Sequence, residues 1–382
     1  MHLLLAFDKF KDALTARQAC KLAAHALRDL HPGWRLDLCP LSDGGEGFTE
    51  ILTGAAGGRL MTVQVSGPRG GLIEAGLGLV PAKKVPAAAR VRLSVENPEA
   101  LLAIADVASA SGLALLPREL RDPWHTTSHG TGQLLRAAAE LRAAAVVLGL
   151  GGSATNDLGL GALSALGLEF RGRHGEKFRP PVPARWPGIA TVEGEVFASI
   201  PPIHLACDVT NPLLGLRGAA AVYGPQKGLR TEDLSRLESE TARLARMLCA
   251  HGHRPESLME EPGAGAAGGI AFGLMCATRA KRLPGFDLVA SWLDLDSRLA
   301  AADLVVTGEG RFDPSSFSGK GPGAVATRAL ALGKPVHIFA GEVAAEPRAG
   351  LAMHAITPAG TPLAQALRDA SANLAAAVRH AL

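Results

Sequence analysis

One stretch constrains the fold of this chain more than any other: a short apolar run that ends in a glycine-rich polar loop. Residues 144–150 are apolar, Gly151 and Gly152 follow, and four polar side chains come next: Ser153, Thr155, Asn156 and Asp157. An apolar run that stops at glycines predicts a buried strand that enters a tight turn. Successive N–H groups in such a turn can bind an anion. The alternative is an ordinary strand–turn–helix connection in which Ser or Thr caps the helix.

The same arrangement recurs along the chain, and this favours a ligand site over an ordinary turn. Residues 3–7, 35–38, 203–207 and 304–307 each resemble a short buried strand, and each precedes a polar loop. These loops carry the following side chains: Asp8 and Lys11, Asp43 and Glu46, Asp208 and Asn211, and Glu309, Arg311 and Asp313. In open α/β sheets, ligands bind at the carboxyl ends of the strands, where these side chains are expected.

The order of the predicted elements indicates two domains. Two strands in the N-terminal segment and three in the C-terminal segment, each followed by a helix, predict one five-stranded parallel sheet. We expect residues 1–62 and 288–382 to form this domain and residues 63–287 to form an inserted α/β domain. Within the insertion we expect hairpins over 62–95 and a helix over 99–113. The active site is expected in a cleft between the two domains, lined by the glycine-rich loops.

Composition narrows the functional class. A chain of 382 residues suggests about two domains. Its net charge of +3 and the lack of a long basic stretch argue against nucleic-acid binding. The five cysteines are scattered, as in reduced cytosolic proteins. No apolar run approaches the roughly 20 residues that span a bilayer, and the N-terminus lacks the features of a signal peptide. We therefore expect a cytoplasmic protein, monomeric or homodimeric, that binds neither membrane nor nucleic acid.

The polar residues of the loops suit a polyanionic nucleotide with Mg²⁺. Acids, lysines, hydroxyls and bare glycine backbone together supply the positioning and charge neutralisation that phosphoryl transfer requires. The chain has no Walker A string, and no dinucleotide fingerprint follows its first strand, which disfavours an NAD-dependent oxidoreductase. A kinase family of another kind is therefore predicted.

Nine short motifs, in order and at sensible spacing, resemble those of the bacterial glycerate kinase family of the first type, along nearly the whole chain. They lie at residues 8–11, 42–47, 110–113, 127–132, 151–157, 206–213, 224–228, 262–269 and 307–311, the last together with Gly319-Lys320. The resemblance implies phosphorylation of D-glycerate that depends on ATP and Mg²⁺, usually to 2-phosphoglycerate. It also implies a flavodoxin-like domain with a second, mixed α/β domain inserted.

Three positions depart from the family's pattern. Asp106 and Gln133 each stand where a Glu is usual, and residues 313–316 replace an Asp followed by a Gln-Thr pair. The first change keeps the charge on a shorter arm, and the second removes a charge at a helix start. Asp106 is equally consistent with a ligand-facing acid and with an ordinary helix-surface acid.

Roles within the site are hypotheses from chemistry. Asp157 or Asp208 is expected to accept the proton of the attacking hydroxyl, and the other to bind Mg²⁺ with Asp43. Lys11 is a further catalytic candidate, and the expected substrate-binding residues are Asp8, Lys11, Asp43, Arg311 and Asn211. The expected nucleotide-binding residues are Gly151, Gly152, Ser153, Thr155, Lys227, Glu309 and Lys320. Three alternatives stay open: a kinase that forms 3-phosphoglycerate, a kinase of another small hydroxy acid, and a non-catalytic sensor of a sugar acid or nucleotide.

Overall fold

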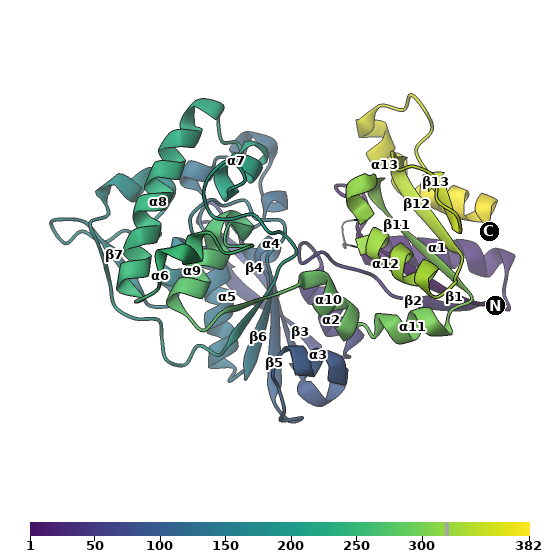
Figure 1. The fold of residues 1–382 in the computed structure, drawn as a ribbon, viewed down its shortest axis with the longest axis horizontal. Coiled ribbons are helices and arrows are strands. Elements are labelled where there is room, and N and C mark those ends of the chain that lie inside the picture. Colours follow the sequence, from purple (N-terminus) through teal and green to yellow (C-terminus); the bar gives the residue numbers. More distant parts are fainter. Residues whose placement is uncertain (318–320) are drawn as a thin grey trace. The chain divides into compact units, whose positions relative to one another are not determined.

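The chain divides into two compact units, each described here by itself (Figure 1). The computed structural model describes residues 1–317 and 321–382. Unit 1 contains Met1–Asp43 and Val289–Leu382, and unit 2 contains Gly44–Leu288. The second boundary lies within a residue of the expected one, but the first lies after Asp43 rather than after residue 62. The reason is helix α2 (Phe48–Ala55), which packs on the sheet of unit 2.

Unit 1 is a five-stranded parallel sheet in the order β13-β12-β11-β1-β2, which confirms the predicted sheet. This is the strand order of flavodoxin-like folds, and the direction of winding reverses between β1 and β11. Its strands are β1 (His2–Phe7), β2 (Arg35–Leu38), β11 (Leu304–Phe312), β12 (Val336–Val343) and β13 (Leu351–Ala355). Its helices are α1 (Ala16–Leu30), α11 (Leu295–Ala301), α12 (Gly321–Ala331) and α13 (Leu363–Ala381), and α10 (Gly285–Trp292) crosses the boundary with unit 2.

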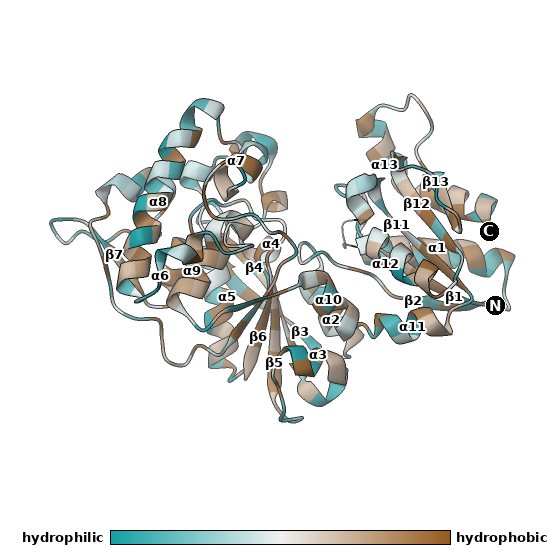
Figure 2. Ribbon diagram, viewed as in Figure 1, coloured by the Kyte–Doolittle hydropathy of each residue, from teal (hydrophilic) through white to brown (hydrophobic). Residues whose placement is uncertain are grey.

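The core of unit 1 follows from the apolar faces of its helices. The predicted capping box is present at the start of α1, where the Thr15 side chain accepts the Gln18 N–H and the Gln18 side chain accepts the Thr15 N–H. Leu27 of α1 and Leu374 of α13 pack with Phe7 of β1 in one buried cluster. Figure 2 shows the corresponding brown, apolar strands between the helices. Helix α12 contacts β1, β11 and β12.

Unit 2 is built on a six-stranded mixed sheet in the order β10-β9-β6-β5-β4-β3. Strands β3 and β4 form an antiparallel hairpin, as expected, and β5 pairs antiparallel with β4 on one side, whereas β5, β6, β9 and β10 are parallel. The strands are β3 (Arg59–Ser66), β4 (Leu72–Pro81), β5 (Leu101–Asp106), β6 (Ala145–Gly149), β9 (Ile203–Ala206) and β10 (Lys281–Leu283), and β7 (Glu169–Arg171) pairs with β8 (Thr191–Glu193). The helices after α2 are α3 (Ala87–Arg92), α4 (Val107–Ser111), α5 (His129–Glu140), α6 (Leu160–Ala165), α7 (Ala219–Tyr223), α8 (Leu234–His251) and α9 (Ile270–Ala277).

Three parts of the sequence prediction are wrong. The range 62–95 forms a hairpin only as far as Pro81, and residues 87–92 form helix α3. The helix expected over 99–113 is strand β5 followed by the short helix α4. Residues 102–106 are all buried between neighbouring strands and helices, and a short apolar run buried on both faces lacks the periodicity that separates a strand from a helix. In addition, residues 308–312 continue strand β11 rather than forming a loop, because β12 pairs with them as far as Phe312.

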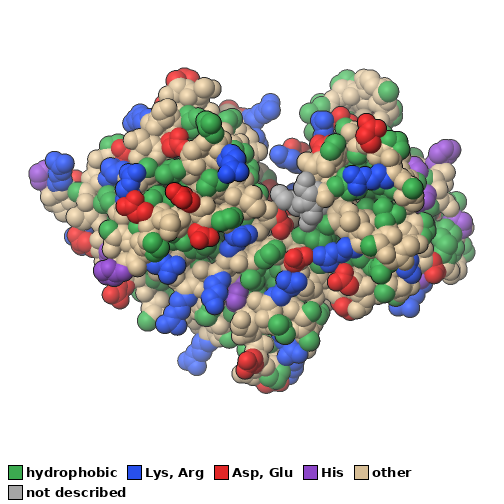
Figure 3. All heavy atoms as spheres, in the orientation of Figure 1, with side chains coloured by type: hydrophobic (Ala, Val, Ile, Leu, Met, Phe, Trp, Pro, Cys, Tyr) green, Lys and Arg blue, Asp and Glu red, His purple; other side chains and the backbone are tan. Residues whose placement is uncertain are grey.

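The surface carries charges of both signs. On the face in Figure 3, basic and acidic side chains are interspersed over unit 2 rather than separated into regions of one sign. Within the described parts of the chain, no helix combines the length and apolarity needed to cross a bilayer.

The packing of α13 yields a stability prediction. Leu374 is fully buried, and Leu363, on the same helix, is 75% exposed. Leu374→Ala is therefore expected to lower the free energy of unfolding by about 2–5 kcal/mol, because it leaves a cavity. The control, Leu363→Ala, should stay within about 0.5 kcal/mol of the parent. Chemical denaturation followed by circular dichroism measures both, and equal effects of the two substitutions would contradict the core assignment.

Candidate functional site

Unit 1 gathers acidic side chains at the carboxyl end of its sheet. Asp8 follows β1 directly, Glu309 lies near the end of the neighbouring strand β11, and Asp43 lies beyond β2. The Lys9 side chain contacts Asp43 with 2.8 Å between Nζ and Oδ1, and the Lys9 N–H donates to Asp8 Oδ1 at 2.7 Å. Because β1 and β11 adjoin where the winding reverses, these acids occupy the position at which open α/β sheets bind ligands.

Burial raises the pKa values of two of these acids, Asp8 and Glu309. Burial, and next the negative charge of Asp43, raise the pKa of Asp8 to about 7. Burial likewise raises the pKa of Glu309 to about 7, against a hydrogen bond with Ser316 that lowers it. Glu309 Oε1 is buried and has no hydrogen-bond partner among the described residues. A buried, unpartnered carboxylate oxygen favours a proton or a cation beside it.

These acids match the chemistry of a Mg²⁺ site in part. Mg²⁺ prefers carboxylate oxygens, keeps several waters, and is commonly held by one or two carboxylates together with substrate phosphates. The unpartnered oxygen of Glu309 beside Asp8 and Asp43 fits such a site. Within the described residues, no group of three or more His, Cys, Asp or Glu side chains is arranged to hold a metal by itself. The expected pair of Asp43 and Asp208 is split between the two units.

The two basic residues expected in unit 1 lie at the surface. Lys11 is exposed three residues after Asp8. Arg311, on β11, is 61% exposed and lies 3.4 Å from the carboxylates of both Asp313 and Glu342. Arg311 is therefore engaged in surface ion pairs, whereas the exposed Lys11 is accessible to solvent. Lys320 lies outside the described residues.

In unit 2, two glycine-rich loops pack backbone against backbone. The Gly151 N–H donates to the Gly44 carbonyl at 2.9 Å. A Cβ atom on Gly151 would lie 2.6 Å from the Cα and N atoms of Gly45, and one on Gly152 would lie 2.6 Å from Glu46 Oε1. Gly151 therefore requires glycine because the atoms it meets are backbone atoms, and Gly152 requires it because its φ of +72° is one that other residues rarely adopt. Two of the predicted glycine-rich loops, the one that contains Gly44 and Gly45 and the one that contains Gly151 and Gly152, are therefore in contact.

The loop after β6 also presents free backbone donors. Leu113 N–H donates to the Gly152 carbonyl at 2.7 Å, and Ala154 N–H donates to the Ser111 carbonyl at 2.8 Å. This isolated antiparallel bridge directs the intervening N–H of Ser153 away from its partner strand. Among the described residues, the N–H groups of Gly152 and Ser153 have no acceptor. Gly152 is exposed, so this turn is accessible to an anion.

Asp157 binds protein groups on all sides. Its Oδ2 accepts the Ser128 N–H and the Ser128 hydroxyl, both at 2.7 Å, and the Gly161 N–H at 3.2 Å. Its Oδ1 accepts the Gly159 N–H at 3.1 Å, and the side chain is fully buried. Burial raises the pKa of Asp157, and these hydrogen bonds lower it. Asp157 therefore ties the loop to the starts of α5 and α6. The hydroxyl-rich run at 126–128, which supplies Ser128, was the one sequence feature that could have indicated this role.

Asp208 is the more accessible of the two candidate bases. It is half-buried after β9, and its two carboxylate oxygens lie 3.1 and 2.9 Å from the Phe286 N–H. The amide of the expected substrate ligand Asn211 is already engaged, because it donates to the Arg217 carbonyl at 2.8 Å and accepts the Tyr223 hydroxyl at 2.7 Å. Asn211 thus stabilises its own loop.

Lys227 and Thr155 support the loop from within. Lys227 is 2% exposed, and its ammonium donates to Ser153 Oγ, the Thr155 carbonyl and Asn156 Oδ1. Burial lowers the pKa of Lys227 to about 7, and the charge of Asp157 raises it in part. Thr155 is fully buried, and its hydroxyl has no partner within residues 1–317 and 321–382. Both side chains lie in the interior of unit 2, and their predicted contact with the nucleotide stays a prediction.

The departures at Asp106 and Gln133 have structural roles. Asp106 Oδ2 accepts the Thr49 N–H at 3.1 Å and the Thr49 hydroxyl at 2.6 Å, while Oδ1 accepts the Ser109 N–H at 2.8 Å. The buried Asp106 therefore caps α4 and holds the start of α2. Gln133 Oε1 accepts the Ser66 N–H at 2.7 Å. Asp106 is thus buried rather than on a helix surface, and both of its carboxylate oxygens accept hydrogen bonds from the protein.

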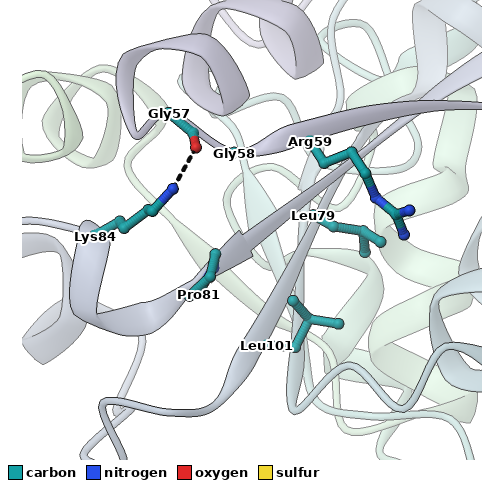
Figure 4. Close-up of a pocket in the computed structure, with 7 residues that line it drawn as sticks. All are labelled: Gly57, Gly58, Arg59, Leu79, Pro81, Lys84 and Leu101. Carbon is teal, nitrogen blue, oxygen red and sulfur yellow. Dashed lines mark hydrogen bonds between the residues drawn. The ribbon is translucent and has the colours of Figure 1, made fainter.

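A surface pocket in unit 2 lies apart from these loops (Figure 4). It is lined by Gly57, Gly58, Arg59, Leu79, Pro81, Lys84 and Leu101. Leu101 begins β5, whereas Asp106 and the loops lie at the strand's other end. Lys84 points to the Gly57 carbonyl, 2.6 Å away, and so satisfies the backbone after helix α2. This pocket is not part of the candidate site.

The contact between the glycine loops is testable. Gly151→Ala is expected to destabilise the protein by about 1–3 kcal/mol, because the added methyl group would meet backbone atoms that cannot move independently. Gly71→Ala is the matched control, since no atom lies within 4 Å of the methyl group it would add. Denaturant unfolding of both variants measures the difference, and a Gly151→Ala variant as stable as the parent would refute the close packing.

The raised pKa of Glu309 predicts a pH dependence. The folded protein holds a proton on Glu309 between the ordinary value of 4.5 and about 7, so this side chain's contribution to stability is lost as pH rises through that window. In metal-free buffer, the stability of Glu309→Gln relative to the parent should increase by roughly 1–2 kcal/mol from about pH 5 to pH 8, reduced by solvent screening. Glu342→Gln, at a side chain that is 61% exposed, should show no such trend. A flat difference for Glu309→Gln would contradict the prediction.

Comparisons with known proteins identify the family. The model of the glycerate kinase family matches residues 3–382. The chain is 35% identical over 351 residues to a glycerate kinase of Halalkalibacterium halodurans, covering 89% of this chain and 85% of that protein. It is 33% identical over 349 residues to glycerate 2-kinase of Escherichia coli K12, covering 90% and 86%.

A solved structure agrees over the whole chain. The crystal structure of a Salmonella typhimurium LT2 protein assigned as glycerate kinase 2 superposes with a TM-score of 0.76 at 36% identity, covering 100% of this chain and 96% of that one. Family model, relatives and structure all point to a kinase. This chain belongs to the glycerate kinase family.

Proposed function

We propose that this protein transfers a phosphoryl group from ATP to D-glycerate, with Mg²⁺, and forms 2-phospho-D-glycerate. Family membership over residues 3–382 supports the reaction class. The name glycerate 2-kinase of the Escherichia coli relative supports the position of transfer. The observation that carries the proposal is the exposed glycine turn of unit 2, whose backbone donors at Gly152 and Ser153 are unpaired among the described residues. The acids at the strand-order reversal of unit 1 support it separately.

The turn after β6 is proposed to bind the phosphates of the nucleotide. The N–H groups of Gly152 and Ser153 are unpaired among the described residues, and Gly151 and Gly152 carry no side chain to obstruct an anion. Fixed backbone donors stabilise charge that develops on a transferred phosphoryl group without reorganising during the reaction. Thr155 supports this turn rather than touching the nucleotide.

The acids of unit 1 are proposed to hold Mg²⁺ with the nucleotide. Asp8, Asp43 and Glu309 supply carboxylate oxygens, and one oxygen of Glu309 is buried without a partner in the described part of the chain. When bound there, Mg²⁺ would neutralise negative charge on the phosphates. Burial, and next the negative charges of neighbouring acids, raise the pKa values of Asp8 and Glu309, so a cation bound beside them would favour their charged forms.

Glycerate requires a cation for its carboxylate and an acceptor for the proton of its hydroxyl. Lys11 is the proposed cation, because it is exposed whereas Arg311 is paired with two carboxylates. Asp208 is the proposed acceptor, because it is half-buried whereas Asp157 is fully enclosed by four donors. The location of the active site between the two units stays a prediction, as does the oligomeric state.

A coupled assay with ATP, Mg²⁺ and D-glycerate, with phosphorus NMR of the product, tests the proposal. We expect glycerate-dependent turnover and 2-phosphoglycerate. Formation of 3-phosphoglycerate would overturn the position of transfer, and turnover only with another hydroxy acid would overturn the substrate. Well-folded protein that binds nucleotide or sugar acid without turnover would favour a sensor.

The role of Asp208 has its own test. Asp208→Asn should lower kcat by about 10²–10⁴-fold, because an amide cannot accept the proton. Asp369→Asn, at an exposed position on α13, is the matched control and should leave kcat unchanged. Steady-state kinetics on both variants, with circular dichroism to check folding, decide the point. A fully active Asp208→Asn variant would remove Asp208 from this role.

A further inference from the structure

Lys227 is placed unlike every other described basic residue of the chain. Among the described lysines and arginines it alone is buried, at 2% exposure. A buried ammonium loses its hydration, so its position is stable only if protein acceptors replace the lost water. The location of those acceptors therefore reveals what this lysine does.

All acceptors of Lys227 come from one loop. Its Nζ lies 2.7 Å from the Thr155 carbonyl, 2.9 Å from Ser153 Oγ and 3.0 Å from Asn156 Oδ1. An ammonium has three donors, and these three contacts use all of them. No donor is left for a phosphate oxygen unless one of these bonds breaks.

The contacts of Lys227 orient the loop. In a trans peptide the carbonyl and the following N–H point in opposite directions, so the bond to the Thr155 carbonyl directs the Asn156 N–H away from the lysine. The bond to the Ser153 side chain holds the residue whose own N–H is unpaired among the described residues. One cation thus fixes the conformation of the turn on both sides of Ala154.

Lys227 is itself held rigidly. It ends a 3₁₀ turn over Pro225–Lys227, and the following Gly228 adopts a φ of 93°, a left-handed conformation that glycine tolerates. A Cβ atom on Gly228 would collide with the Arg121 carbonyl, so this turn packs closely against another segment of unit 2. A lysine on so constrained a turn has little freedom to reach outward to a ligand.

We propose that Lys227 is a positioning residue that holds the 151–157 turn in its phosphate-binding conformation from the interior of unit 2, without touching the nucleotide. This inference rests on the proposed nucleotide site and names the internal cation on which its geometry depends. The competing assignment is a direct contact between the lysine and a phosphate. The two differ in measurable ways.

The first test compares Lys227→Met and Lys227→Arg with the parent. Lys227→Met should weaken binding of a non-hydrolysable ATP analogue by about 10- to 100-fold, as loss of a supporting residue typically does. Lys227→Arg should be equally impaired, because the guanidinium fork cannot match three acceptors arranged around one nitrogen. Lys83→Met, at an exposed lysine, is the control and should bind as the parent does. Recovery of affinity in Lys227→Arg would support direct phosphate contact and overturn the proposal.

The salt dependence of binding separates positioning from direct contact. Isothermal titration with the analogue at several salt concentrations gives a slope that reflects ion pairs with the phosphates. A positioning residue leaves this slope unchanged in Lys227→Met, whereas loss of a phosphate contact makes it shallower. A shallower slope would overturn the proposal. If Lys227 only stabilised the fold and did not affect the turn, Lys227→Met would lower the thermal stability and leave the nucleotide affinity at the parent's value. That result would also overturn the proposal.

A milder substitution covers the case in which Lys227→Met does not fold. Asn156→Ala removes one acceptor and leaves the lysine in place, so it should weaken analogue binding several-fold with an unchanged salt slope. Unchanged affinity in this variant would overturn the inference. Parent protein that binds no ATP analogue would overturn the proposed function and the inference together, whereas an active parent with an unimpaired Lys227→Met variant would overturn the inference alone.

Discussion

The close approach of backbones at glycine is the constraint on which the second unit depends. Gly151 packs on Gly45, Gly149 on Phe48 and Gly268 on Thr155, at distances that no side chain would permit. These contacts bring loops from distant parts of the chain together at the end of one sheet. The polar groups of the loops meet only because the glycines lack side chains.

Buried charge is handled differently in the two units. In unit 2, Asp157 and Lys227 are both buried, and each is surrounded by hydrogen-bond partners within the loops. In unit 1, the buried Asp8 and the partly buried Glu309 lie near a third acid, and one buried oxygen of Glu309 has no partner among the described residues. In unit 2, protein groups satisfy the buried charges of Asp157 and Lys227, and these hydrogen bonds rigidify the turn. The arrangement in unit 1 is electrostatically incomplete and therefore suits a cationic ligand.

Much of the fold could be predicted from local patterns. The parallel sheet, the capping box of α1 and the β3–β4 hairpin follow from periodicity and turn residues. The failure at β5 has a physical cause, because a strand buried on both faces shows no alternation. The boundary after Asp43 could not be predicted either, because α2 attaches to unit 2 through contacts with strands distant in sequence, such as the hydrogen bond between Thr49 and Asp106, 57 positions apart.

The sequence by itself determined which loops carry ligand-binding chemistry, because glycines, acids and hydroxyls that follow short apolar runs are local features of the sequence. Only the tertiary structure decided which polar side chains are accessible to a ligand and which are buried in contacts within the protein. Lys227 and Asp157 carry the charges expected of nucleotide and substrate contacts, yet both are used inside the protein. The reason is distance along the chain: Lys227 meets Ser153 across 74 positions, and Asp157 meets Ser128 across 29. Such pairings depend on how the loops pack, which no local pattern encodes.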